Sequence, residues 1–142
     1  MFTPNQADVR RFFCAAWRKQ VEQQPMEAIE TIAAQWAIEH PEYHAQLADE
    51  EKALGHTGEV SESNAFLHLS LHLSLTEQCS IDQPKGIRAA MEALIERHGD
   101  LHAAHHDAME CLAMMIWETQ RSGRPPDVQT YLSAVQRKAT AD

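Results

Sequence analysis

The sequence predicts an all-α fold, built as a single-domain irregular helical bundle of about five to seven helices. Apolar residues recur at three- and four-residue spacing over most of the chain, which is typical of amphipathic helices. The 5 glycines and 6 prolines fall mostly between these periodic stretches, where they separate one helix from the next. A chain of 142 residues suits one compact domain, so we expect residues 1–142 to fold together.

The N-terminal third of the chain predicts two helices and a shorter third one. The first runs from about Ala7 to Gln23, with an apolar stripe formed by Val9, Phe12, Phe13, Ala16 and Trp17. Pro25 breaks this helix and suits the first turn of the next, whose apolar face holds Ile29, Ile32, Ala33 and Trp36. Pro41 ends or kinks the second helix, because the residue before a proline disfavours helical geometry. A short helix is expected within residues 41–51, followed by a loop over residues 52–63 that includes His56.

The stretch at 64–80 gives the least obvious assignment. Its leucines alternate with polar residues, which is the pattern of a half-buried strand. We nevertheless predict a helix, because the stretch lacks Val, Ile and Tyr, leucine favours helices, and Ser63 or Asn64 can cap it. A lone strand in a helical chain would also leave its backbone groups without partners. As a helix it is apolar on nearly every side, so we expect the buried central helix at 64–80.

The C-terminal half predicts three more helices. One runs from about Ile87 to His98, after which Gly99 and Asp100 mark a break or a tolerated kink. A long helix over residues 100–121 follows, closed by Gly123 and two prolines. Its expected core stripe is Leu101, Ala104, Ala108, Cys111, Leu112, Met115 and Ile116, with Trp117 at the edge. A last short helix covers residues 127–137.

Charge and composition exclude several functional classes. The formal net charge is −9, a field that repels phosphate backbones and anionic membranes, so we expect neither nucleic acid nor membrane as a partner. No apolar run approaches the roughly 18–20 residues of a membrane span, and no targeting segment is recognisable. The 3 cysteines are widely spaced, which favours reduced thiols and a cytoplasmic location. Homo-oligomerisation and protein partners stay open.

Histidines at four-residue spacing are the strongest functional signal. Seven of the 9 fall into three blocks, His40/His44, His68/His72 and His98/His102/His106, and the last block runs on to Glu110. Residues four apart lie on one helix face, about 5–6 Å apart at Cβ, so two imidazoles can share an ion. We predict that His68, His72, His102 and His106 are the core metal ligands. His40, His44 and Glu110 would complete a second metal position or support the first ligands by hydrogen bonds.

Two interpretations of these blocks stay open. In the first, the chain binds one or two transition-metal ions, with iron, zinc and manganese as the candidates and no organic cofactor. In the second, it is a non-enzymatic structural or protein-interaction module whose histidines form a buried hydrogen-bond network. His105 and His98 are excluded from the predicted site, because His105 is off the main stripe and His98 precedes a helix break. The sequence assigns no reaction, since it carries no H-E-x-x-H, P-loop, G-x-G-x-x-G or G-x-S-x-G motif.

Several segments together resemble a known family over nearly the whole chain. They are MFTP and VRRFF near the start, HPEYH at 40–44, NAFLHLSLHLSL at 64–75, EQCSIDQPKGIRA at 77–89, HAAHHDAMECL at 102–112 and WETQRSGRPPD at 117–127. This set resembles a family of small proteobacterial proteins catalogued as a domain of unknown function, number eighteen-forty-one. The resemblance implies a soluble, single-domain bacterial protein and supplies no activity, substrate or cofactor. Position 105 departs from the family pattern, which expects a different polar residue there.

Overall fold

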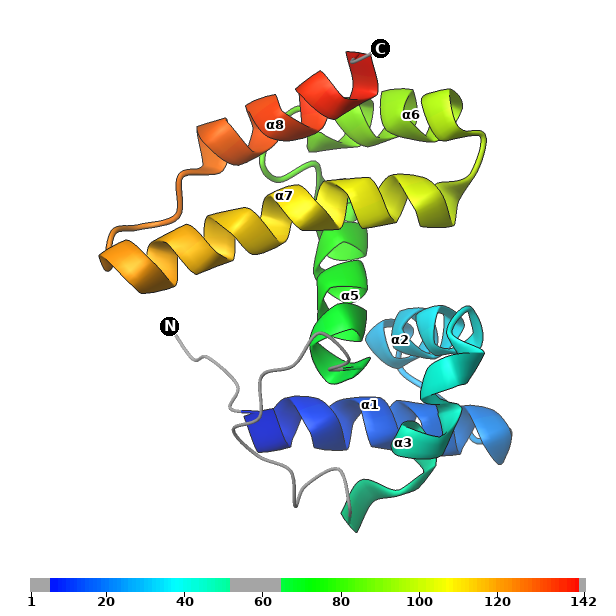
Figure 1. Ribbon diagram of the computed structural model, residues 1–142. Helices are drawn as coiled ribbons and strands as arrows, with labels where there is room; N and C mark the ends of the chain where they lie inside the picture. Colours follow the sequence, from blue (N-terminus) through cyan, green and yellow to red (C-terminus); the bar gives the residue numbers. More distant parts are fainter. Residues whose placement is uncertain (1–5, 52–64, 141–142) are drawn as a thin grey trace. The chain divides into compact units, whose positions relative to one another are not determined.

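The computed structural model describes residues 6–51 and 65–140, and every regular element in these ranges is helical. The described residues form seven α-helices and one 3₁₀ helix, which confirms the predicted all-α bundle (Figure 1). The chain divides into two compact units, residues 1–73 and residues 74–142, with the division inside one helix. The prediction of a single domain stays a prediction. None of the described helices combines the length and apolarity needed to cross a bilayer.

The N-terminal unit contains α1 (Gln6–Val21), α2 (Ala28–Ile38), the 3₁₀ helix η1 (Pro41–Tyr43), α3 (His44–Ala48) and the first part of α5 (Ala65–Ile81). Within this unit α1 packs against both α2 and α3. The predicted break at Pro41 is confirmed: His40 adopts φ −126° and ψ 68°, outside the helical region, as expected before a proline. The predicted loop at 52–63 and the capping residues Ser63 and Asn64 lie outside the described residues.

The start of α2 differs from the prediction that placed Pro25 in its first turn. The helix begins at Ala28, because the backbone N–H of Glu27 donates to the side chain of Glu30 (2.9 Å) and closes the N-terminus there. The other oxygen of Glu30 accepts from Lys19 Nζ at 2.7 Å, which joins α2 to α1. These contacts hold the pKa of Glu30 below its ordinary value, the Lys19 hydrogen bond being the largest cause.

The core of the N-terminal unit is a single cluster of buried side chains. All four aromatic residues predicted on the apolar faces of α1 and α2 contribute to it or pack against it. Its members are Phe13, Cys14, Ala16, Ala33, Trp36, Ala37, Leu47, Ala65, Phe66, Leu69 and Leu73. The buried guanidinium of Arg10 lies over the ring of Phe66, 5.1 Å from its centroid. The first part of α5 therefore shares one core with α1, α2 and α3.

The prediction of a buried helix at 64–80 is confirmed by α5. Its alternating leucines do not select a strand, since every third or fourth residue of the segment is also apolar and therefore marks a helix face. Leu69 and Leu75 are fully buried, and so is His72 between them. Leu67 is the exception, with 48% of its surface exposed. The helix therefore buries polar imidazole along with leucine, and this feature shapes the candidate site.

The C-terminal unit is built from the end of α5 together with α6 (Ile87–His98), α7 (Leu101–Ser122) and α8 (Val128–Thr140). Gly99 ends α6 with φ +70°, so this position is a true break and not a kink. Asp100 then caps α7 by accepting the N–H of Ala103 at 2.9 Å, and Asp127 caps α8 by accepting from Thr130. In this unit α8 packs on both α6 and α7, and α6 on α7 (Figure 1).

The buried residues of α7 cover a shorter stretch of the helix than the core stripe predicted from the sequence. Ala104, Ala108, Cys111 and Leu112 are buried as expected. Leu101 and Ile116 are exposed, so their assignment to the core is wrong, and Trp117 is 53% exposed. The buried residues of α7, which is 22 residues long, all fall between Ala104 and Leu112. The C-terminal half of α7 therefore presents apolar side chains to solvent.

Candidate metal centre

His40 is positioned by the end of α2. It is the last residue before Pro41, and it is 2% exposed. Its Nδ1 lies 2.7 Å from the carbonyl oxygen of Trp36, one of the last carbonyls of the helix. A carbonyl can only accept, so Nδ1 carries the proton of the neutral ring and Nε2 carries the lone pair. The backbone thereby fixes both the orientation and the tautomer that a metal ligand requires.

His68 and His72 are supplied by one face of α5. Their ring centroids lie 4.8 Å apart, and each also lies 4.8 Å from the ring centroid of His40. The three rings form an equilateral arrangement within the N-terminal unit, which we call the histidine trio. One ring nitrogen from each residue lies within 4.8 Å of the other two. His72 is fully buried and His68 is half-buried.

The separation of the ring nitrogens suits a shared ligand. Nε2 of His68 lies 3.1 Å from Nε2 of His40. Two nitrogens bound tetrahedrally to one ion at 2.0–2.1 Å are about 3.3 Å apart. The same 3.1 Å also suits a hydrogen bond in which Nε2–H of His68 donates to the lone pair of His40. Small movements would convert one arrangement into the other.

Aromatic rings line two sides of the trio. The indole of Trp36 stacks on the ring of His72, with centroids 4.0 Å apart and planes inclined by 16°. Tyr43 stacks on His40, with centroids 5.3 Å apart and planes inclined by 6°. Burial, helped by the charge of Glu42, raises the pKa of the Tyr43 phenol. The walls therefore restrict the imidazole rings and reduce their contact with water. The sequence analysis assigned Trp36 to the core and did not identify either ring as a wall of the site.

His44 faces elsewhere, although the sequence predicted it beside His40. Its Nε2 lies 2.7 Å from the carbonyl oxygen of Ala37, and its ring stacks on Trp17 with centroids 4.2 Å apart. His44 is not a member of the trio. The reason is local: Pro41 interrupts the helix, so residues 40 and 44 do not share a helical face.

The remaining predicted ligands are on α7 in the C-terminal unit. His102 and His106 contact each other edge to face, with ring centroids 4.4 Å apart, as their spacing predicts. Glu110, one turn further on, accepts a hydrogen bond from Lys138 Nζ at 2.9 Å. His98 binds Asp107 at 2.7 Å and thereby ties the end of α6 to α7. The prediction that His102, His106 and Glu110 join one centre with the other blocks stays a prediction.

His105, which the sequence excluded from the site, is a core residue of the C-terminal unit. It is 4% exposed. Burial lowers the pKa of its imidazole to about 4, and the neighbouring His102 and His106 act in the same direction. It is therefore neutral at physiological pH.

Comparison with known proteins gives a family and no relative of established activity. A family model described as Domain of unknown function (DUF1841) matches residues 5–137. No curated protein and no solved structure matches the chain.

Proposed function

This chain belongs to the DUF1841 family of domains of unknown function, and we propose that it binds a transition-metal ion through His40, His68 and His72. The observation that carries the proposal is the trio itself, in which two imidazoles from α5 and one from the residue before Pro41 bring their nitrogens within 4.8 Å of one another. Three histidines with a further position left for water or a small molecule are a ligand set found at catalytic zinc sites. Imidazole also suits iron and other first-row ions, so zinc, iron and manganese are the ions to test.

A second candidate function rests on the 3.1 Å contact between His40 and His68. In this alternative the trio is a buried hydrogen-bond network that specifies the packing of α5 against the end of α2. The protein would then be a structural or interaction module without a metal. Both alternatives predict that the trio contributes to folding, so stability measurements on variants cannot separate them. Metal content can.

The first experiment measures metal content on protein purified without a histidine tag. We expect about one equivalent of zinc, iron or manganese per chain by elemental analysis. Removal with a chelator should lower the unfolding temperature, and restoring the ion should raise it. An ion present at a hundredfold excess over its Kd stabilises a folded protein by about 2.7 kcal/mol. Trace metal and no effect of chelator would favour the hydrogen-bond network.

Variants then locate the site. The double change His68→Ala with His72→Ala should abolish metal binding and chelator sensitivity together. His40→Gln should weaken binding at least about tenfold, because it removes one of three ligands. His44→Gln and His98→Gln are matched controls, since each removes a histidine outside the trio. Both controls should keep the wild-type metal content.

Trp36 offers an optical readout of the same event. Its indole stacks on His72 at 4.0 Å, so a paramagnetic ion such as Co²⁺ bound there should quench its fluorescence. Trp17, stacked instead on His44, provides a reference within the same unit. Quenching that survives in the His68→Ala, His72→Ala protein would contradict the assignment.

A further inference from the structure

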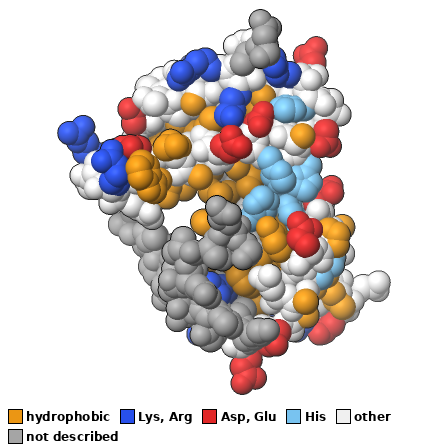
Figure 2. All heavy atoms as spheres, in the orientation of Figure 1, with side chains coloured by type: hydrophobic (Ala, Val, Ile, Leu, Met, Phe, Trp, Pro, Cys, Tyr) orange, Lys and Arg blue, Asp and Glu red, His pale blue; other side chains and the backbone are white. Residues whose placement is uncertain are grey.

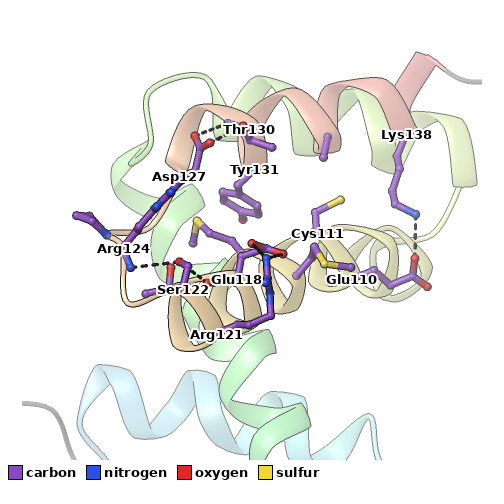
Figure 3. Close-up of a pocket in the computed structure, with 15 residues that line it drawn as sticks. Glu110, Cys111, Glu118, Arg121, Ser122, Arg124, Asp127, Thr130, Tyr131 and Lys138 are labelled. Carbon is purple, nitrogen blue, oxygen red and sulfur yellow. Dashed lines mark hydrogen bonds and ion pairs between the residues drawn. The ribbon is translucent and has the colours of Figure 1, made fainter.

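The C-terminal unit holds a cavity of about 710 Å³ between α7 and α8, separate from the histidine trio. This volume falls within the roughly 300–1,000 Å³ of small-molecule sites. Figure 3 shows α7 on one side of the cavity and α8 on the other, with Tyr131 and Cys111 directed toward the space between them. The loop that joins the two helices supplies Arg124 and Pro125 at one end.

The cavity has mostly apolar walls. Cys111 and Tyr131 are buried, and Met114, Met115 and Ala134 complete the apolar lining. The hydroxyl of Tyr131 already donates to Gln78 at 2.7 Å, so the ring and not the hydroxyl is the surface offered to a ligand. Methionine side chains adapt to flexible aliphatic groups. Hydrophobic side chains also reach the surface near the C-terminal end of α7, beside basic residues (Figure 2). The walls therefore favour an aliphatic occupant.

The charges around the cavity leave one cation available. Lys138 pairs with Glu110 at 2.9 Å, and Arg121 pairs with Glu118 at 2.8 Å (Figure 3). Both cations therefore already have a carboxylate.

Asp127 is engaged in capping α8 through Thr130. Among the described residues, the guanidinium of Arg124 makes no ion pair, while its backbone N–H donates to Ser122. Arg124 is therefore the group to which an anionic ligand would bind.

The net charge of −9 does not oppose such a ligand at close range. At physiological ionic strength, exposed charges are screened beyond about 8 Å. A carboxylate in the cavity would sit within reach of the Arg124 side chain, which can bind it through two parallel N–H donors. Three acidic and three basic side chains line the cavity, and Arg124 is the basic one that makes no ion pair with a described residue, so it is where an anionic group would bind.

We propose that this cavity binds an aliphatic monocarboxylate, with the carboxylate on Arg124 and the hydrocarbon chain against Met114, Met115 and Tyr131. The proposal does not rest on the proposed metal site, because no residue of the trio lines the cavity. Two features of the cavity favour this class of ligand: its walls are mostly apolar, and the guanidinium of Arg124 makes no ion pair within the described part of the chain.

The test uses the full chain and three probes of equal length: octanoate, octanol and octylamine. Titration with octanoate should give saturable chemical-shift changes in amide NMR spectra, confined to residues of α7, α8 and their connection. Octanol should bind more weakly than octanoate, and octylamine most weakly. Tighter binding of octylamine, or no saturable change with any probe, would overturn the proposal.

Two matched variants test the role of the charge. Arg124→Gln should weaken octanoate about tenfold and leave octanol unchanged. Arg137→Gln removes an exposed arginine of α8 that does not line the cavity, so it should change neither. Equal effects of the two variants would overturn the proposal, because the effect would then come from the overall charge of the protein and not from a contact between the ligand and Arg124.

A third variant tests the cavity. Ala134→Phe fills the space, and it should abolish binding of octanoate and octanol together. If instead the wild-type chain self-associates at the concentrations used and Ala134→Phe prevents this, the occupant is a second copy of the chain and the carboxylate proposal is wrong.

Discussion

His105 illustrates how burial, helped by two neighbouring histidines, can set the protonation state of a side chain. The ordinary imidazole pKa is about 6.5, and that of His105 is lowered to about 4 because burial penalises its charged form. Between these two values the unfolded chain takes up a proton that the folded chain does not. Stability should therefore be fully present above about pH 6.5 and should fall as the pH drops toward 4.

We predict the size of this effect from the shift. At about 1.4 kcal/mol per pKa unit, His105 should cost roughly 3 kcal/mol of unfolding free energy between pH 6.5 and 4. Denaturant unfolding at several pH values measures it. His105→Gln, which keeps a polar side chain and cannot titrate, should flatten the profile over this range. An unchanged profile in the variant would assign the pH dependence to other groups.

The candidate site could be predicted from the sequence only where the backbone is regular. The four-residue spacing brought His68 near His72 and His102 near His106, as expected on continuous helices. It failed for His40 and His44, because the proline between them interrupts the helix. That His40 joins His68 and His72 depends on the packing of α2 against α5, which periodicity does not encode.

Helix boundaries in this chain follow from single capping residues. Asp100 accepts the N–H of Ala103 at the start of α7, directly after Gly99 ends α6. Asp100→Ala should lower the unfolding free energy by about 1 kcal/mol, the usual loss for an N-cap. Glu96→Ala is the matched control, since it removes an exposed acid from the neighbouring helix without touching a cap. Chemical denaturation monitored by circular dichroism compares them, and equal losses would contradict the capping role.

Most helix boundaries could be predicted because the residues that end a helix act on their immediate neighbours in the sequence. Pro41, Gly99 and Gly123 act on the residues next to them, so their effects are visible in the sequence. Burial along a helix is not local. The apolar residues of α7 continue past Leu112, yet the second half of the helix is exposed because cover depends on the neighbouring helices. The cavity between α7 and α8 lies along this half of α7. No pattern in the sequence predicted it.

At the scale of the whole chain, the two units give different responses to a metal ion. His40 lies just after the C-terminal end of α2, and His68 and His72 lie in the first part of α5, all within residues 1–73. Adding zinc to the chelated protein should therefore slow amide hydrogen exchange in α2 and early α5, and leave α6 and α8 unchanged. Exchange measured by mass spectrometry tests this. Protection of α7 as well would support the prediction that His102 and His106 belong to the same centre, whereas uniform protection would contradict a local site.

The composition of the trio has an electrostatic consequence. Its described members are all imidazoles, which bind as neutral donors and bring no carboxylate to the group. A divalent ion held there would keep its full double charge beside His40 and His72, which are almost inaccessible to water. Such a charge is costly in a poorly polarisable surrounding, so electroneutrality would favour an incoming anion at the remaining position. The metal-loaded protein should therefore bind azide or cyanate more tightly than uncharged molecules of similar size, and it would discriminate among small molecules first by their charge.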